Sequence, residues 1–270
     1  MKDMKKLMVA ALAVLFCAGN VLAEKVVLEG STTVLPIAQK AAEQYMDANS
    51  KADITVRGGG SGVGINSLIA GTCDIADASR AMQDAEIKTA ATKNITPKAF
   101  TIAMDGIAVI VNNSNTVSAL SKQQVADIYT GKVTNWSQVG GKNLKIVVIS
   151  RDSSSGTFEC FNELALKKQK VVADALMQAS NQAVVTTVEK TPGAIGYAGI
   201  GYVSSSIKAL TIEGVNPSAA TVLNGKYAYS RPLYMYTNGE PKGETKNFIN
   251  FVLSKDGQKI VAEEGFVALQ

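Results

Sequence analysis

Three segments of the chain combine hydroxyl side chains with glycine, and each follows a short apolar, β-branched run. The clearest is Arg151–Thr157 (RDSSSGT), which follows Ile146–Ile149 and opens a segment with helical apolar spacing. The other two are Gly30–Thr33 (GSTT) and Gly58–Gly62 (GGGSG). A loop that opens a helix presents unpaired backbone N–H groups and the positive end of the helix dipole. Together with hydroxyls and a guanidinium group, such loops can bind an anion.

The elements around these loops are expected to be the same each time, a strand before the loop and a helix after it. Strands are expected at 25–28, 54–57 and 146–149. A single loop of this kind is usually only a helix N-cap. Ligands of open α/β sheets, however, bind beyond the carboxyl ends of the strands, where all three loops would lie. The repetition therefore favours one shared anion site.

Strands alternate with helices along the chain, which predicts an α/β fold with largely parallel sheets. Two long apolar segments, at 101–111 and 229–237, are expected to be strands that cross between two lobes. We therefore predict a first lobe at residues 24–105 that is completed by 231–270. The second lobe is predicted at 106–230, with the two crossover strands as the hinge.

Three further segments have apolar residues at helical spacing. They lie at 171–179, at 183–188 and at 244–264, the last long segment of the chain. In the third segment Phe248, Phe251 and Ile260 would face the core. We expect a helix over each segment.

The composition excludes several classes of protein. The chain has no histidine, which removes Ser-His-Asp and Cys-His catalysis and argues against a catalytic zinc site. Neither GxGxxG nor GxxxxGK[ST] occurs, so no motif supports a dinucleotide or nucleoside triphosphate. Without the first 23 residues, which hold three lysines and one aspartate, the net charge falls from +4 to +2, too small to imply nucleic acid. We predict a protein that is not an enzyme, with no metal and no cofactor.

The N-terminus has the pattern of an export signal over residues 1–23, with a basic start, an apolar core and a small-residue cleavage site. Cys17 is a poor lipidation site because Phe16 before it is bulky. We therefore expect a soluble, monomeric exported protein. Cys73 and Cys160 could pair in an oxidising compartment, and the sequence leaves that question open.

Six motifs occur in order over nearly all of the mature chain: GSTTVLP (30–36), GGGSGVGI (58–65), DIADASR (74–80), DGIAVIVN (105–112), RDSSSGT (151–157) and TPGAIGY (191–197). Together they resemble the exported phosphate-binding proteins of the Pst-type phosphate ABC transporter. The resemblance implies a two-lobed, type II periplasmic-binding-protein fold, with a mixed, mostly parallel sheet flanked by helices in each lobe. It also implies a periplasmic receptor that closes on inorganic phosphate and delivers it to the transmembrane permease of an ABC importer.

The same resemblance implies which residues contact the ligand. They come from all three hydroxyl loops, with Ser31 as a neighbouring donor. The implied contacts are Thr32, Thr33, Ser61, Arg151, Ser155, Gly156 and Thr157.

One position departs from the family pattern. In well-described members an aspartate in the DIADASR region accepts a hydrogen bond from the ligand, and here Ser79 stands at that position, followed by Arg80. A carboxylate acceptor favours phosphate over sulfate, because sulfate has no proton to donate at neutral pH. Asp105, whose apolar neighbours predict burial, or Asp77 could take that role, and we expect Asp105 to do so. Arg80 is a weaker candidate than Arg151 for binding the oxyanion.

Three alternatives to a phosphate receptor remain open. The missing aspartate motivates a receptor for sulfate, molybdate or another oxyanion. A hydrolase that uses a loop serine with lysine or aspartate as its base is disfavoured by the absence of a GxSxG elbow. The last is an exported scaffold or adhesion protein that has kept the fold and lost transport.

Overall fold

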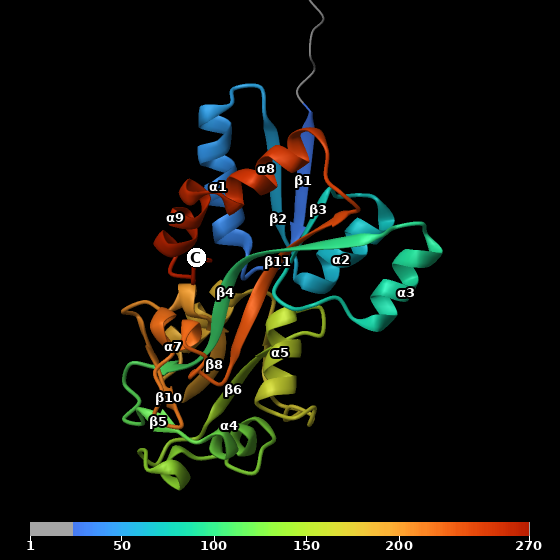
Figure 1. Ribbon diagram of the computed structural model, residues 1–270. Coiled ribbons are helices and arrows are strands. Elements are labelled where there is room, and N and C mark those ends of the chain that lie inside the picture. The colour runs from blue at the N-terminus through green and yellow to red at the C-terminus, as the bar shows by residue number, and fades with distance from the viewer. Residues whose placement is uncertain (1–23, 270) are drawn as a thin grey trace, which may run out of the picture.

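The computed structural model describes residues 24–269, so the predicted export signal lies outside the described residues. The chain is arranged as two lobes, and two strands, β4 (Pro97–Asn112) and β11 (Ser230–Asn238), run from one to the other (Figure 1). The lobe boundaries at 105/106 and 230/231 stay a prediction, which we use to name the first and second lobes. Over the described range, no helix has the length and apolar character needed to cross a membrane.

The first lobe is built from both ends of the described chain. Its elements are β1 (Lys25–Gly30), α1 (Leu35–Ala48), β2 (Asp53–Gly58), α2 (Ser61–Ala70), β3 (Ile75–Ala78), α3 (Asp84–Thr92), α8 (Gly243–Leu253) and α9 (Lys255–Glu263). The strand order is β2-β1-β3-β11-β4. β1 is parallel to β2 and β3, and β11 is antiparallel to β3 and β4. The loops that follow β1, β2 and β3 therefore all lie at the carboxyl ends of these parallel strands, facing the second lobe (Figure 1).

Apolar side chains cover both faces of the first lobe's sheet. On one face Leu28 of β1 packs with Ile37 of α1 in a core that includes α8 and α9. On the other face Ile65 and Leu68 of α2 pack with Ala76 of β3. Each fully buried aliphatic side chain contributes about 1.5–3 kcal/mol, so the helices fix where the three loops emerge.

The second lobe continues the same sheet in the order β4-β8-β6-β7, with β9 also paired to β4. β6 is parallel to β7 and β8, β4 is antiparallel to β8 and β9, and β5 and β10 form a separate pair. Phe161 stacks on Tyr197 in its core, with ring centroids 4.0 Å apart. The elements are β5 (Ala119–Leu120), α4 (Lys122–Tyr129), the 3₁₀ helix η1 (Trp136–Val139), β6 (Val147–Arg151), α5 (Gly156–Leu164), β7 (Leu176–Gln178), α6 (Asn181–Lys190), β8 (Ala194–Gly199), the 3₁₀ helix η2 (Ile200–Tyr202), β9 (Ile207–Ala209), β10 (Thr211–Ile212) and α7 (Ala219–Leu223).

Two predicted helices differ from the structure. Residues 171–179 are not helical, because Leu176–Gln178 pairs with Ile149–Arg151 as an edge strand. The final helix is interrupted at Ser254, which has extended backbone angles and accepts the N–H of Gly257 as the N-cap of α9. Apolar spacing alone missed the break because α8 and α9 pack into the same core.

Candidate anion-binding site

The hydroxyl loops of the two lobes meet in the structure. Thr33 Oγ1, after β1, lies 3.0 Å from Thr157 Oγ1, in the first turn of α5. The backbone N–H of Gly62 in α2 donates to the carbonyl oxygen of Ser154 at 2.9 Å. The first turn of α5 therefore contacts the first loop of the other lobe, and the segment before α5 contacts the start of α2. The lobes are closed on each other.

Gly156 allows this close approach. A Cβ atom at this position would lie 2.3 Å from Ser61 Oγ and 2.8 Å from Ser79 Oγ, both in the first lobe. Any side chain at this position would force Ser61 and Ser79 to move. The glycine therefore lets the N-terminus of α5 reach the hydroxyls of the opposite lobe.

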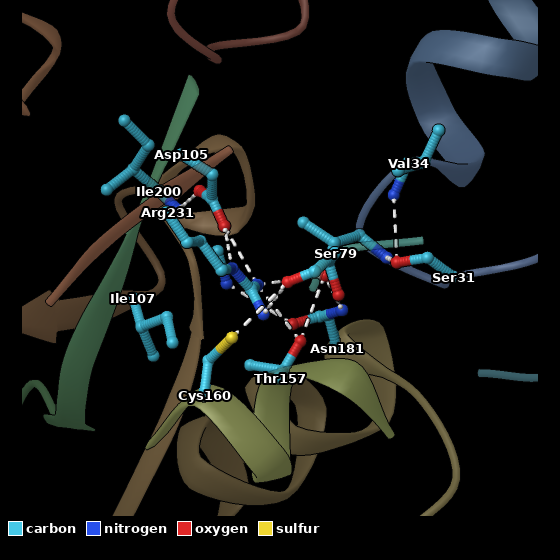
Figure 2. Close-up of polar contacts among 12 residues, drawn as sticks. Ser31, Val34, Ser79, Asp105, Ile107, Thr157, Cys160, Asn181, Ile200 and Arg231 are labelled. Atoms are coloured by element: carbon cyan, nitrogen blue, oxygen red, sulfur yellow. Dashed lines mark hydrogen bonds and ion pairs between the residues drawn. The ribbon is translucent and has the colours of Figure 1, made fainter. Parts of the chain in front are cut away.

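Serine hydroxyls hold the first-lobe loops in shape. Ser31 Oγ accepts the backbone N–H of Thr33 at 3.1 Å and that of Val34 at 3.4 Å (Figure 2). Ser61 Oγ accepts the backbone N–H of Ser79 at 3.0 Å, and the two serine Oγ atoms are 3.3 Å apart. All these hydroxyls are buried, so each is oriented by the backbone around it.

Arg151 is a buried cation with one nitrogen free. Its Nε donates to the carbonyl of Gln178 at 2.8 Å and its Nη2 to that of Ala179 at 3.0 Å. Its Nη1 is buried without a hydrogen-bond partner among the described residues. Burial lowers the pKa of the guanidinium from its ordinary value. A buried donor of this kind is normally satisfied, so it marks a position where an anion can bind.

Asp105 and Arg231 form a buried ion pair between the crossover strands, where they are register partners. Arg231 Nε and Nη2 lie 3.0 and 2.8 Å from Asp105 Oδ2, and Asp105 Oδ1 accepts the N–H of Ile200 at 3.0 Å. Burial raises the pKa of the Asp105 carboxyl group, and the Arg231 charge opposes that rise. Figure 2 shows Arg231 extending from this pair toward Thr157 and Ser79.

Asn181, the first residue of α6, adds a second-lobe amide to the site. Its Nδ2 donates to Thr32 Oγ1 and to Thr33 Oγ1, both at 3.0 Å. Its side chain is fully buried. Asn181 therefore joins the two lobes through the first hydroxyl loop.

Arg80 lies at the side of the site and is neutralised by carboxylates. Its guanidinium pairs with Glu86 at 2.7 Å within the first lobe and with Glu159 of α5 across the lobes. Gln83 also donates to Glu159, at 2.9 Å. With two carboxylates as partners, Arg80 acts as a contact between the lobes.

Asp77 is a buried carboxyl group away from these contacts. Within the described part of the chain, neither of its oxygens has a hydrogen-bond partner. Burial raises its pKa well above the ordinary value, so the neutral form is favoured. The backbone carbonyl of Asp77 accepts the N–H of Ser31, in the first hydroxyl loop, at 2.7 Å.

Known proteins resemble this chain over most of its length. A family model described as the PBP superfamily domain matches residues 18–256. The phosphate-binding protein PstS of Bacillus subtilis is 35% identical over 245 residues, 89% of this chain and 79% of that protein. That of Staphylococcus aureus (strain USA300) is 37% identical over 254 residues, 89% of this chain and 77% of that protein.

The chain belongs to the PstS family of phosphate-binding proteins. Among solved structures, a putative phosphate ABC transporter substrate-binding protein with bound phosphate from Clostridium perfringens has a TM-score of 0.86 and 34% identity, covering 92% of this chain and 100% of that one. An ABC-type phosphate transport receptor from Vibrio cholerae has a TM-score of 0.74 and 35% identity, covering 90% and 100%. The prediction of a type II periplasmic-binding-protein fold is therefore confirmed for this PstS-family chain.

The structure brings most of the predicted site residues together. The hydroxyl residues, Gly156 and Arg151 lie in or beside the interface of the lobes. Asp105 is buried as predicted, but its carboxylate is bound to Arg231 and Ile200 rather than open to a ligand. Cys73 and Cys160 are both free in the structure.

Two residues of the site were missed by sequence reasoning. Arg231 stands in an apolar crossover strand, and a charge in such a strand needs a partner. Asp105 is likewise a charged residue in an apolar crossover segment. The sequence therefore allowed the prediction that Asp105 and Arg231 pair with each other. The helix expected at 183–188 begins two residues earlier in the structure, as α6, so Asn181 lay between two expected helices and outside both.

Proposed function

We propose that this chain captures inorganic phosphate between its two lobes and delivers it to the permease of an ABC importer. One observation carries the proposal. Oriented hydroxyls from both lobes meet within 3.0 Å of each other, beside Arg151, whose Nη1 is buried and without a partner in the described chain. Membership of the PstS family supports phosphate as the anion.

The proposed contacts are donors rather than catalytic groups, and the protein is a receptor rather than an enzyme. Hydroxyls and backbone N–H groups replace the water around phosphate, and Arg151 supplies the charge. The N-terminus of α5 adds its free amides and its dipole. The proposed set is Ser31, Thr32, Thr33, Ser61, Ser79, Arg151, Ser155, Gly156 and Thr157; Arg80 and Asp105, which are paired with other charges, are left out.

Closure of the lobes is the proposed mechanism of both affinity and signalling. The set is divided between the lobes, so neither lobe of an open protein offers all of the donors to the ion. The full set forms when the lobes rotate about β4 and β11, and a permease can recognise that closed form. The protein would act outside the cytoplasm, as a monomer in the periplasm after export.

A different oxyanion is the second candidate, and the serine at position 79 favours it. Asp105 is held by Arg231, and the Asp77 side chain makes no hydrogen bond to the hydroxyl loops. The carboxylate that we expected to accept the ligand's proton is therefore already engaged in an ion pair. Sulfate, which has no proton at neutral pH, would meet no repulsion from such a group.

Calorimetric titration with phosphate and with sulfate tests the proposal. We expect phosphate to bind with a clear heat and to raise the melting temperature. Tight binding of sulfate without any phosphate heat would select the second candidate. Native mass spectrometry of protein purified without added anions gives an independent test, because a tightly bound ion is retained.

A further inference from the structure

The orientation of the Asn181 side chain is fixed by the backbone around it. Its Oδ1 accepts the N–H of Gly199 at 3.2 Å. Because a backbone N–H can only donate, the oxygen of the amide must face Gly199. The NH₂ group then faces Thr32 Oγ1 and Thr33 Oγ1, at 3.0 Å each. Asn181 therefore donates to both threonine oxygens and accepts from neither.

Arg231 donates to the threonines from another direction. Its Nη2 lies 3.1 Å from Thr33 Oγ1 and 3.0 Å from Thr157 Oγ1. Asp105 holds the guanidinium from the opposite side, through Nε and Nη2, and the carbonyl of Ser79 accepts from Nη1 at 3.2 Å. Nη2 carries two N–H groups and Asp105 takes one of them, so the other is shared between the two threonine oxygens. A guanidinium has no acceptor atom, so both oxygens accept from that shared N–H.

These contacts determine the direction of the Thr33 proton. A hydroxyl group has two acceptor positions and one proton. Asn181 and Arg231 occupy both acceptor positions of Thr33 Oγ1. The Thr33 proton must therefore go to Thr157 Oγ1, 3.0 Å away, or to a bound ion.

The same count applies to Thr157 when Thr33 donates to it. Thr157 Oγ1 then accepts from Arg231 and from Thr33, so its own proton is directed to the ligand. In either arrangement, at least one hydroxyl donor at the meeting point of the lobes is presented to the ion. When Thr33 donates to Thr157, neither oxygen keeps an acceptor position for the ion's proton.

We infer that Asn181 and Arg231 are positioning residues that hold the Thr33 and Thr157 hydroxyls as donors toward the bound ion. When Thr33 donates to Thr157, this side of the site selects deprotonated oxygens of the oxyanion. The inference rests on the proposed function, yet it concerns two side chains that act through the threonines. In this arrangement Asp105 holds the Arg231 guanidinium in position through their ion pair.

A double-mutant cycle between Asn181→Ala and Thr33→Val tests the inference. The dissociation constant for phosphate is measured by calorimetry, and the melting temperature without phosphate checks folding. We expect Asn181→Ala to weaken phosphate binding by about tenfold or more, the scale of a hydrogen bond to a charged group. In the Thr33→Val background, Asn181→Ala should reduce phosphate affinity by a factor at least about three times smaller, because the hydroxyl that Asn181 orients is absent.

A purely structural role would weaken binding by the same factor in both backgrounds, and that result would overturn the inference. Asn112 provides the matched control, because it is a buried second-lobe asparagine that donates to Val188 and Glu189. Asn112→Ala should lower the melting temperature and leave phosphate affinity unchanged.

A second variant keeps the test decisive if Asn181→Ala fails to fold. Asn181→Asp has the same size and can still accept from Gly199, but it offers Thr32 and Thr33 an acceptor in place of a donor. We expect it to bind phosphate at least as poorly as the alanine variant, with the same dependence on Thr33. Wild-type affinity in Asn181→Asp would contradict the inference. Failure of the wild-type protein to bind phosphate would instead refute the proposed function.

Discussion

At the scale of single residues, Arg151 is the cation of the site that keeps a donor for the ligand. The second lobe fixes its Nε and Nη2, so the free Nη1 points in a defined direction. Arg151→Lys keeps the charge and loses the planar fork. We expect about a 10- to 100-fold loss of phosphate affinity, from the roughly 1.5–3 kcal/mol of a charged hydrogen bond.

Calorimetry measures this loss, and Arg57→Lys is the matched control. Arg57 is exposed at the end of β2, so its substitution should leave the dissociation constant unchanged. Equal affinity of wild type and Arg151→Lys would show that Arg151 does not contact the ion.

Asp77 makes the protein's stability depend on pH. Burial raises its pKa well above the ordinary value, so the folded protein holds a proton that the unfolded chain has already lost. The unfolding free energy is therefore highest below the unfolded pKa, near 4, and falls as pH rises toward the folded pKa. Within that window the slope is about 1.4 kcal/mol per pH unit.

We expect Asp77→Asn, which cannot ionise, to lack this component of the slope. Urea unfolding between pH 4 and pH 8 measures it, and the variant should gain stability relative to wild type as pH rises. Asp47→Asn, at an exposed position of α1, is the control and should keep the wild-type slope. Parallel pH profiles for wild type and Asp77→Asn would contradict the prediction.

At the scale of elements, the start of α5 must serve both its own helix and the closure of the lobes. Gly156→Ala favours the helix by up to about 1 kcal/mol, but the added Cβ would lie 2.3 Å from Ser61 Oγ. We expect the variant to keep or raise its melting temperature without ligand while it loses phosphate affinity by tenfold or more.

Calorimetry and thermal unfolding measured together separate these opposite effects. Glu163→Ala, an exposed substitution on the same helix, should change neither quantity by much. If Gly156→Ala bound phosphate normally, the close contact with Ser61 would not be required for binding.

The elements also explain how far the sequence could be interpreted. Each strand–loop–helix unit is local, so β-branched runs and hydroxyl loops predicted the units that carry Thr33, Ser61 and Thr157. The ion pair of Asp105 and Arg231 joins residues 126 positions apart through antiparallel register. Periodicity contains no information on that register, so the partner of Asp105 could not be assigned. The position of Asn181 also depends on non-local pairing, because β7, the edge strand before α6, pairs with β6.

At the scale of the whole molecule, closure is supported by a contact outside the proposed ligand set. Arg80 of the first lobe pairs with Glu159 of the second, and Gln83 donates to the same carboxylate. Glu159 is partly exposed, with 22% of its side chain accessible. A partly solvated pair contributes at most about 1 kcal/mol and weakens with salt. The contact should therefore adjust the lifetime of the closed form without determining which ion is bound.

Glu159→Gln removes this charge pair and leaves the hydroxyl loops intact. We expect phosphate to dissociate about two- to fivefold faster, because loss of a contact in the closed state acts mainly on the dissociation rate. The preference for phosphate over sulfate should stay the same, and the difference from wild type should shrink as salt is added. Stopped-flow measurement of phosphate release at low and high salt tests all three expectations. Glu163→Gln, an exposed neighbour on α5, should release phosphate at the wild-type rate, and an equal rate in Glu159→Gln would mean that this contact does not stabilise the closed lobes.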